Sequence, residues 1–560
     1  MSRHHRGRRL VGVQHSQRSP GRKRTPPIAR EIDRSRKQCR ERDHHRSFWL
    51  VSVVAMLDDE ARSAEGGQQQ RQERARQAQE RVHGRASLRP PPAVASATGG
   101  ASALCQPLRY RAQQPGYGVP ASRVASQAMP AHAVLLVIAS AMALAGAEIS
   151  VGPGRGLTRL EDAFPLAKPG DSIIVHARAD GQPYARTALR LTLPGLTLRG
   201  MPDSSGKRPV LDGAGATFAA GDQPRAIIVI GPEAVGATVA GFHLTGAGAA
   251  AGIYIDGADQ VTIDDCEITA CDRGLVSVGS ADTAREVLVS SCHIHHNATD
   301  NVVLGGGGGR LVGCAIHHAI AGRNLVSRAH RTVLEASWVH DAAAAEIDLL
   351  DEAGVSDRAG GLMLVLGCVL AKRRDCPGNR SVIRCGQDRG GDRVGIIHIV
   401  HSTVITPYAA AVVELTAPGA KAAFANCIVA DPTGGGSGRM LVARDGLPVE
   451  PTWAGGLWLA YGYQAPRGAA GVTNGAFSSQ PPFVDHAAGD VRLRADAGVP
   501  FIDSALPLAN IPLPVSALTS GHPLRQRPPV LLGFRSGKPA GVRKVVGSGL
   551  DLGAYEAEPQ

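Results

Sequence analysis

A short pattern recurs along the second half of this chain and limits what it can fold into: Cys or Ser, any residue, then Ile, Val or Leu. The pattern begins seven times, at Cys266, Cys292, Cys314, Ser337, Cys368, Ser402 and Cys427. The steps between successive copies are 26, 22, 23, 31, 34 and 25 residues. Steps in the low twenties, with β-branched residues at alternate positions and Gly, Asn and Asp between them, are typical of a coil of stacked strands.

A second set of alternating segments lies between these copies. We expect its strands at 253–255, 275–278, 302–304, 325–327, 347–349, 382–384 and 412–415. Helical repeats would show apolar residues spaced by 3.6 instead. The chain is therefore predicted to be all-β, a solenoid in which each turn of the coil, or rung, buries its apolar residues only against its neighbours. The five consecutive glycines at 305–309 are interpreted as a flexible turn, because no Gly-Lys-Ser/Thr follows as in a phosphate loop.

The charge of the chain is unevenly distributed. The net charge is +12, but residues 1–147 hold 25 Lys and Arg against 10 Asp and Glu, and residues 148–560 hold 36 against 39. The basic excess therefore belongs to the leader, and the rest of the chain gives no reason to expect a nucleic-acid partner. Residues 1–128, rich in Arg, Gln, Ser and Pro, are predicted to be a disordered basic leader.

An apolar stretch at residues 129–147 ends in Ala145-Gly146-Ala147, a small-x-small pattern before Glu148. This is typical of a secretory signal peptide and is too short for a stable membrane span. Since such signals act at a chain start, we expect translation to begin near Met129 and the product to be secreted, periplasmic or on the cell surface. The alternative is an Ala-rich linker that matches by chance.

Eight of the ten cysteines lie from Cys266 onward, and five of them hold the first position of the repeated pattern. That position should point inward, so we interpret these five as small buried residues. Neighbouring rungs are about 4.8 Å apart, so pairing between them is the alternative. Cys376 and Cys385 flank a predicted loop and are candidates for a disulfide. No CxxC pair or other metal-type spacing occurs, which leaves a zinc finger unsupported.

The region after the signal divides by pattern. Residues 148–200 are predicted to form an N-terminal cap, with a helical turn over 160–166, and the first rungs. Residues 201–435 should form the repeats, and 436–560 the C-terminal rungs and a closing segment. The two longest steps predict loops inserted at 351–361 and 372–379, and insertions of this kind often build a binding face.

Three stretches carry a resemblance to a known family. The opening SVGPGRGLTRLEDAFPLAKPGDSIIV, the later PPFVDHAAGDVRLRADAGVPFIDSA and the terminal DLGAYE resemble the first and last rungs of secreted right-handed parallel β-helix proteins of the pectate-lyase-like superfamily. The middle part resembles a bacterial subgroup of unknown activity. The resemblance covers about 148–560 and implies the fold. It does not select a chemistry, because the superfamily includes lyases, hydrolases, epimerases and non-catalytic surface proteins.

Histidines follow the pattern on one predicted outer face. Alternation places five aromatic or imidazole side chains there over three rungs: His293, His295, His317, Trp338 and His340. The next column holds His296, His318, Asp341 and Lys372. Such histidines can bind a metal through Nε2, act as a general base or contact a sugar that stacks on Trp338. The alternative is a polar ladder that only satisfies backbone groups.

The second column of strands carries charged residues. Four carboxylates lie within seven residues, Glu346, Asp348, Asp351 and Glu352, and their oxygens are ligands that Ca²⁺ accepts. A solvated acidic loop is the alternative. Arginines lie close to them in sequence, including Arg323, Arg328 and, further on, Arg384. We therefore treat Ca²⁺ as a candidate cofactor.

Cleavage of an acidic polysaccharide by β-elimination needs a cation for the uronate carboxylate, a base and an acid. Arg323 or Ca²⁺ is a candidate for the first role, and Lys372 or His340 for the second. Trp338, His295, His317, Arg328 and Arg384 are the predicted substrate contacts. Lyases of the resembled superfamily use Lys and Arg with Ca²⁺, but no intact lyase motif occurs here. A hydrolase would instead need paired carboxylates, such as Asp348 with Asp300 or Glu414.

Two functions remain open from the sequence. One is an enzyme on extracellular polysaccharide, such as a lyase of uronic-acid polymers, with its site near Arg323 and Lys372. The other is a non-catalytic carbohydrate-binding or adhesion module on the cell surface. In both cases the expected partner is a polysaccharide or cell-surface glycan, and the protein is expected to be a monomer.

Overall fold

A computed structural model describes residues 146–216, 225–373, 376, 381–386, 392–406, 412–430, 438–439, 441–443, 458–461, 463–464, 483–486, 490–496 and 501–557. The chain divides into two compact units, 1–124 and 125–560, and the described residues all belong to the second. The leader at 1–128 and most of the 129–147 segment lie outside the described residues. Among the described residues, no helix has the length and hydrophobicity that crossing a membrane requires.

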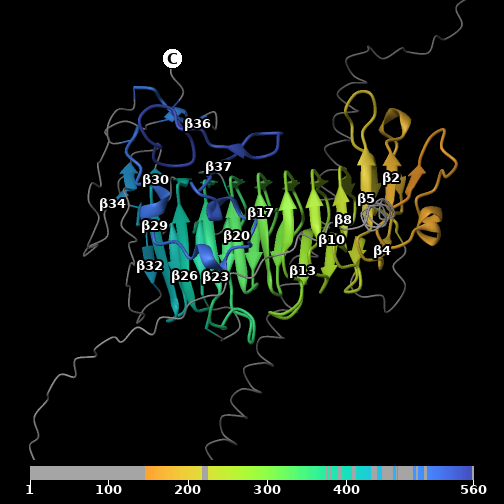
Figure 1. The fold of residues 1–560 in the computed structure, drawn as a ribbon, viewed down its shortest axis with the longest axis horizontal. Coiled ribbons are helices and arrows are strands. Elements are labelled where there is room, and N and C mark those ends of the chain that lie inside the picture. Colours follow the sequence, from red (N-terminus) through yellow and green to blue (C-terminus); the bar gives the residue numbers. More distant parts are fainter. Residues whose placement is uncertain are drawn as a thin grey trace, which may run out of the picture. The chain divides into compact units, whose positions relative to one another are not determined.

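Three parallel sheets, named here A, B and C, form the coil, and each rung adds one strand to each (Figure 1). The strands of sheet A are β1 (Glu148–Val151), β2 (Ser172–His176), β5 (Thr197–Met201), β8 (Thr238–Ala240), β11 (Thr262–Asp264), β14 (Val287–Ser290), β17 (Gly308–Val312), β20 (Arg331–Glu335), β23 (Leu362–Leu366), β26 (Gly395–Val400) and β29 (Ala420–Ala425). The strands of sheet B are β3 (Tyr184–Ala185), β6 (Val210–Asp212), β9 (His243–Thr245), β12 (Glu267–Ile268), β15 (His293–His295), β18 (Ala315–His317), β21 (Trp338–His340), β24 (Val369–Ala371), β27 (Thr403–Ile405), β30 (Cys427–Ala430) and β33 (Trp458–Tyr461). The strands of sheet C are β4 (Leu189–Leu191), β7 (Ala226–Ile230), β10 (Ala251–Asp256), β13 (Arg273–Val278), β16 (Val302–Leu304), β19 (Leu325–Ser327), β22 (Ile347–Leu349), β25 (Ile383–Cys385), β28 (Val413–Leu415) and β32 (Leu441–Ala443).

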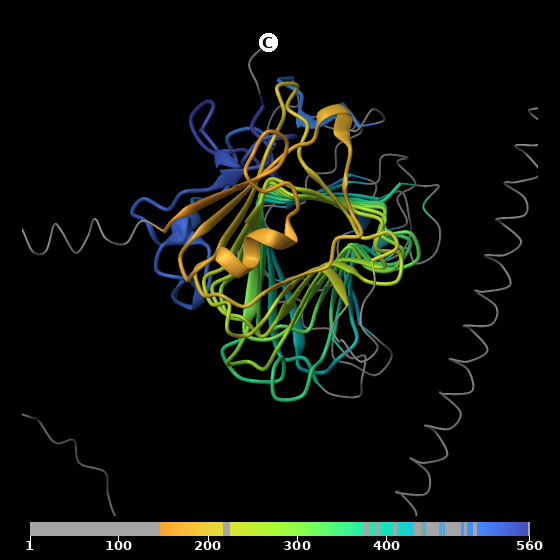
Figure 2. The same ribbon diagram turned by 90° about the vertical axis from the view of Figure 1, so that its right-hand side faces the viewer.

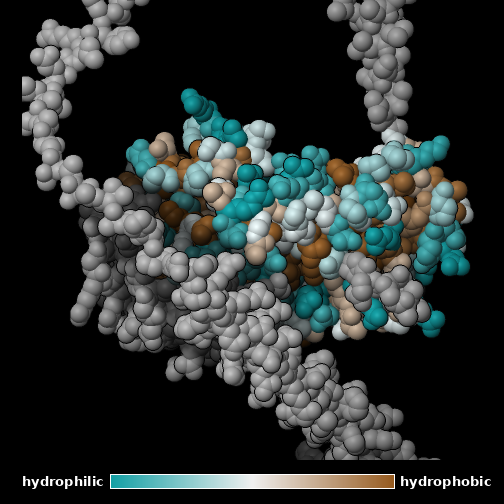
Figure 3. Space-filling model, turned by 90° about the horizontal axis from the view of Figure 1, so that it is seen from below, coloured by the Kyte–Doolittle hydropathy of each residue, from teal (hydrophilic) through white to brown (hydrophobic). Residues whose placement is uncertain are grey.

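The interior of the coil is apolar because alternate residues of every strand point into it. One rung shows the rule: Val289, Ile294 and Val302, from sheets A, B and C in turn, are completely buried. Hydrophilic and apolar residues are interspersed over the outer face that Figure 3 displays. The predicted all-β coil is confirmed. The repeated Cys or Ser pattern falls on sheet B, and the second set of predicted strands corresponds to sheet C.

The corner between sheets A and B explains the repeated Cys or Ser pattern. The residue just before each Cys or Ser has positive φ, for example 55° at Ser291 and 65° at Gly313. A single residue in the left-handed region turns the chain sharply, and the next side chain is directed into the coil. At Gly313 a Cβ would also lie 3.0 Å from the backbone nitrogen of Ala540, so this corner has no room for a larger residue.

The five cysteines of the pattern are buried, as predicted, and none is paired with another. Burial raises the pKa of the Cys314, Cys368 and Cys427 thiols to about 12. The predicted disulfide is wrong, because Cys376 and Cys385 are both free thiols. Cys385 lies on β25 with its side chain in the core, whereas the Cys376 thiol donates to the carbonyl oxygen of Ala342.

The first rungs are closed by a short 3-10 helix, η1 (Glu161–Leu166), within the range where a helical turn is expected. Figure 2 views the coil end-on and shows η1 in front of the first rungs. Leu160 and Ala163 are buried there against the apolar interior. Another short 3-10 helix, η2 (Ala179–Gly181), precedes β3.

Strands β32 and β33 extend sheets C and B beyond residue 435, as C-terminal rungs should, and residues 501–557 then run back along the outside of the coil (Figure 1, dark blue). The other elements after residue 435 are short: β31 (Gly438–Arg439) with β34 (Tyr463–Gln464), β35 (Phe483–Asp485) with β36 (Asp490–Leu493), β37 (Leu532–Gly533) with β38 (Gly541–Val542), and the 3-10 turns η3 (Leu508–Asn510), η4 (Val515–Ala517) and η5 (Pro523–Arg525). Leu518 and Leu524 pack on the outer face of sheet A against Leu364. Phe501 and Leu552 pack on sheet B.

Candidate functional site

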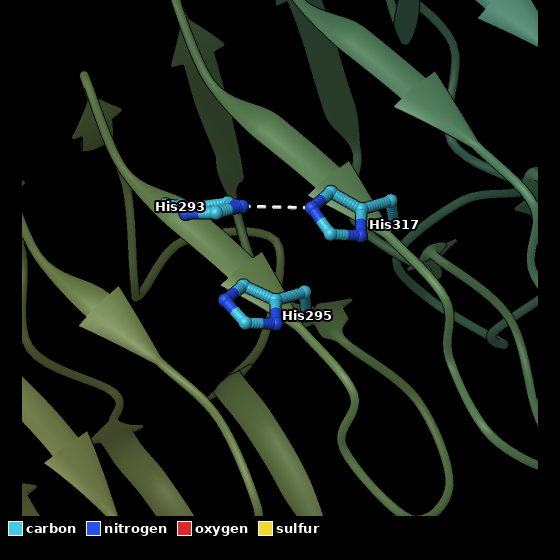
Figure 4. A group of neighbouring side chains, drawn as sticks. All are labelled: His293, His295 and His317. Atoms are coloured by element: carbon cyan, nitrogen blue, oxygen red, sulfur yellow. Dashed lines mark hydrogen bonds between the residues drawn. The ribbon is translucent and has the colours of Figure 1, made fainter. Parts of the chain in front are cut away.

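The histidines predicted to share an outer face are brought together on sheet B. His295, His317 and His340 occupy the same position on the adjacent strands β15, β18 and β21. Their rings stack, with centroids 4.9 Å apart for the first pair and 4.6 Å for the second. His293, two residues before His295, faces the same side, and Figure 4 shows its ring turned toward that of His317. The Trp338 ring lies 4.6 Å from the His340 ring at the far end of the row.

Each stacked imidazole is also bonded to the residue that follows it. His295 Nδ1 lies 2.8 Å from His296 Nδ1, and His317 Nδ1 lies 2.7 Å from His318 Nδ1. In the third rung the following residue is Asp341, whose carboxylate lies 2.8 Å from the ring nitrogen. These second residues have φ of 52°, 54° and 61°, a conformation that His and Asp adopt more readily than most residues. The corner therefore fixes the orientation of the outer rings.

The imidazoles of His293 and His317 are held in the neutral form. Burial, with the charges of neighbouring histidines, lowers the pKa of His317 to about 2 and that of His293 to about 4. The neighbouring imidazoles, that of His295 first, lower the pKa of Glu267 to about 2. At neutral pH these two rings therefore present uncharged nitrogens close to the Glu267 carboxylate, which suits metal ligands.

The charged residues of sheet C form an ion ladder on its outer side. Arg323 bonds to Asp300 at 3.0 Å and to Asp348 at 3.0 Å. Arg384 donates two hydrogen bonds to the Asp348 carboxylate, of 2.8 and 2.7 Å. Burial opposes the charge of Arg323, but the two carboxylates raise its pKa well above its usual value. Arg323 and Arg384 are therefore both paired with carboxylates of the protein itself. Asp348 lies between these two arginines, whereas a hydrolase needs a carboxylate that can reach the substrate.

Lys372 does not lie on the outer face, so the prediction that it is an accessible base is wrong. Its side chain is completely buried and its Nζ lies 2.9 Å from Glu346 Oε1, which is also completely buried. The ammonium also donates to the carbonyl oxygens of Ala342 and Ala344. Glu346 in turn accepts from the side-chain amide of Asn324. Lys372 thus ends a polar ladder inside the corner between sheets B and C.

The predicted Ca²⁺ cluster does not form, because the four carboxylates lie in different surroundings. Glu346 is turned to Lys372 and Asp348 to the arginines of the ion ladder. Asp351 is buried, and Glu352 Oε2 lies 3.8 Å from Arg328 Nε. In the described part of the chain, the groups that could hold a metal ion consist of histidines: His293, His295 and His317, and the overlapping set His317, His318 and His340.

A cleft of about 390 Å³ lies on the outer side of sheet A, beneath the C-terminal segment. Glycines 307–309 form part of its floor, and Leu518 and His522 border it from the C-terminal segment. Four arginines line it, Arg285, Arg310, Arg331 and Arg358, against two carboxylates, Asp282 and Glu286. At Gly308 a Cβ would lie 2.6 Å from the carbonyl oxygen of Arg331, so this position has no space for a side chain. The floor of the cleft is therefore bare backbone there.

At the border of this cleft, Arg310 is fixed by a buried carboxylate. Its Nε donates to Glu335 Oε2 at 2.6 Å, and His522 Nε2 lies 3.2 Å from the same oxygen. Because the amide of Leu524 donates to His522 Nδ1, a neutral His522 carries its proton on Nε2, toward Glu335. Burial acts to raise the pKa of Glu335, but the bonds from His522 and Arg310 outweigh it and lower the pKa.

The cleft was not predicted from the sequence. Arg285 and Arg358 lie on loops, and its roof comes from residues about 200 positions later in the chain than its glycine floor. The available signals were the glycine run followed by Arg310 and the sequence Arg328-Ala-His330-Arg331. The glycine run contains the predicted turn, at 306–307, and continues into strand β17, and glycines 307–309 line the cleft.

Comparison with known proteins agrees with this architecture. Residues 226–357 match the family model for the right handed beta helix region. A crystal structure of pectate lyase Pel9A is similar with a TM-score of 0.42 and 13% sequence identity, over 74% of this chain and 98% of that chain. No curated protein matches. The chain is a right-handed parallel β-helix, with three parallel sheets and the fold that the resemblance implied.

Proposed function

We propose that this β-helix binds an acidic polysaccharide, with uronate units held in the arginine cleft on sheet A. The observation that carries the proposal is the lining, with four arginines around a floor of bare glycine backbone. A planar guanidinium suits a carboxylate because it can donate two parallel hydrogen bonds. Because glycines 307–309 have no side chains, a sugar ring can approach the backbone of the floor directly.

The existing ion pairs of the cleft leave room for such a ligand. Arg285 is paired with Asp259, and Arg358 with Asp282, but the side chains of these arginines are 60% and 48% exposed. Exposed pairs of this kind contribute little, so a uronate can replace the carboxylate partner at small cost. Arg331 is exposed and pairs with no carboxylate in the described part of the chain. It is therefore the first contact that we assign to a bound uronate.

Charge reversal at Arg331 tests this proposal. The full chain is titrated with polygalacturonate and alginate and, as a neutral polymer, dextran. Arg331→Glu should weaken binding to the acidic polymers about tenfold or more, the equivalent of one charge-assisted contact. Arg199→Glu is the matched control, because Arg199 is exposed on strand β5 of the same sheet and does not line the cleft. Equal loss in both variants, or no binding of acidic polymers by the wild type, contradicts the proposal.

A second candidate function, β-elimination, rests on His330 in the same cleft. His330 Nδ1 lies 3.1 Å from the carbonyl oxygen of Val355, so the neutral ring donates there and keeps a free electron pair on Nε2. Burial lowers the pKa of His330, which keeps the ring neutral. With an arginine neutralising the carboxylate, a base at this place can remove the proton from C5 of a uronate. The C–H electron pair then forms the C4–C5 double bond, the bond from C4 to the bridging oxygen breaks, and that oxygen takes a proton from water.

The ultraviolet absorbance of new double bonds separates the two candidates. A lyase should produce this signal on at least one uronic-acid polymer, and His330→Gln should remove it while binding persists. Binding without new double bonds or reducing ends identifies a carbohydrate-binding module. As part of the same proposal the protein is exported, as 129–147 predicts, and a mature N-terminus near Glu148 would support this.

A further inference from the structure

The histidine face on sheet B is separate from the arginine cleft and has a chemistry that the proposed function does not use. His293 and His295 project from one strand, β15, and His317 projects from the adjacent β18 (Figure 4). Their ligand nitrogens all lie within 4.8 Å of one another. We propose that His293, His295 and His317 bind a divalent transition metal of borderline softness, Zn²⁺ above all, through their Nε2 atoms.

The orientation of the rings selects Nε2 as the ligand atom. Nδ1 of His295 and Nδ1 of His317 are already bonded to His296 and His318. A ring that binds a metal through Nε2 carries its proton on Nδ1, so the contact of His295 becomes a donation to His296. His317 can donate to His318 in the same way once the Arg373 guanidinium moves away from His318 Nε2, because a neutral imidazole cannot accept at both nitrogens. Metal-binding histidines generally make such a second bond, which fixes the ring and its tautomer.

The spacing of the nitrogens needs only a small adjustment. His293 Nε2 and His317 Nε2 are 2.7 Å apart, a contact in which one ring must donate to the other. Zn–N bonds of about 2.0–2.1 Å in a tetrahedron require nitrogens about 3.3 Å apart, so this pair must open by about 0.6 Å. Rotation of the imidazoles about their last torsion supplies this, because that torsion has a broad minimum.

His295 provides a further argument, since its Nε2 is buried and makes no hydrogen bond. The nearest carboxylate oxygen, Glu267 Oε1, is 3.5 Å away. Buried polar atoms normally have a partner, and a metal ion is a partner for an imidazole nitrogen. Glu267 also adds a negative charge beside the three rings and stands close enough to become a fourth ligand or to hold a metal-bound water.

The overlapping group His317, His318 and His340 is less suited to a cation. The guanidinium of Arg373 lies 2.9 Å from His318 Nε2 and would repel a metal there. Near the first group the corresponding cation is Arg208, which is paired with Asp265. Imidazole ligands favour Zn²⁺, Ni²⁺, Co²⁺ and Cu²⁺, whereas Ca²⁺ prefers oxygen, so Ca²⁺ should not compete.

The test uses tag-free full-length protein, because a polyhistidine tag would bind the same ions. After removal of metals with a chelator, the protein is dialysed against Zn²⁺ and the bound metal is measured by elemental analysis. Co²⁺ is added in parallel, since a tetrahedral Co²⁺ site gives a visible spectrum that Zn²⁺ abolishes on exchange. The wild type should hold one more tightly bound Zn²⁺ than His317→Gln. Its melting temperature should also rise with Zn²⁺.

Three further variants decide the assignment. His293→Gln should weaken Zn²⁺ binding about tenfold or more, as His317→Gln does, because each removes one of three ligands. His340→Gln should leave the tight site intact, because His340 belongs only to the overlapping group, and so should His176→Gln, a change on β2 of sheet A. Equal metal content in the wild type and His317→Gln overturns the proposal, as does loss in His340→Gln with retention in His293→Gln. Histidines of residues 1–145 are unchanged in all variants and contribute a constant background.

Discussion

Replacing Lys372 by Met should destabilise the β-helix strongly without affecting polymer binding. In the wild type, Nζ bonds to Glu346 Oε1 and to the carbonyl oxygens of Ala342 and Ala344, with no exposed surface on either charged side chain. The Met variant leaves the Glu346 carboxylate buried without its cation and removes the ammonium donor from both carbonyls. Breaking one side of a buried ion pair costs about 3–5 kcal/mol.

The pH of this experiment matters because burial raises the pKa of Glu346 to about 7. The folded state then binds one proton more than the unfolded state between the ordinary carboxyl pKa and about 7, so stability contributed by this group falls as pH rises through that window. At about pH 8 the wild-type carboxylate is ionised, so the loss of the Lys372 charge has its largest effect on the free energy of unfolding. The double variant Lys372→Met with Glu346→Gln should recover about 2 kcal/mol of the loss, since no charge is then left unpaired.

Thermal unfolding followed by circular dichroism measures this effect. For the roughly 340 described residues the unfolding entropy is about 0.7 kcal/mol per degree, so a loss of 3–5 kcal/mol lowers the melting temperature by about 4–7 °C. A change below about 1 °C would refute the burial of this pair. Loss of polymer binding at an unchanged melting temperature would instead indicate that Lys372 is exposed and contacts the polymer, as its position in the sequence predicts.

Three other results are expected. Acidification below about pH 6.5 should lower the melting temperature, because the unfolded chain then binds protons that the folded His293 and His317 refuse, and His317→Gln should flatten this pH profile. Gly308→Ala should cost about 1–3 kcal/mol on thermal unfolding and weaken polymer binding, because φ is 142° and the new Cβ meets the backbone of Arg331. In the native protein Cys314 and Cys368 should escape alkylation at about pH 8 and react after denaturation, as peptide mapping can show, because burial raises their pKa to about 12. Labelling of either thiol in the native state would contradict the inward orientation of the pattern.

The fold was predictable because one rung is a local unit repeated many times. The alternation sets which side chains enter the coil, and the residue before each Cys or Ser makes the corner by adopting positive φ, as Ser291 and Ala336 do. The same rule located the histidine face, since residues two apart on a strand and equivalent residues on the next rung share a side. These features depend on neighbours within one or two rungs, and the sequence displays both.

The alternation rule fails at corners and where distant segments meet. Lys372 directly follows strand β24 and was placed outside by extending the strand pattern, but at the corner its side chain turns inward to Glu346. The arginine cleft depends on the C-terminal segment, which carries no repeat. The pairing of Glu335 with His522 joins positions 187 residues apart, and no local spacing indicates it.

The C-terminal segment borders both proposed sites and therefore cannot be treated as a dispensable tail. On sheet A, His522 contacts Glu335, which also holds Arg310 at the border of the cleft. On sheet B, the Phe534 ring lies 6.0 Å from that of Trp338, at the end of the histidine row. A truncation before this segment would expose the apolar outer faces that it covers on both sheets and would remove His522 from Glu335, the partner of Arg310. Loss of binding in such a truncation would not locate a site, whereas single substitutions at Arg331 and His317 separate the two surfaces.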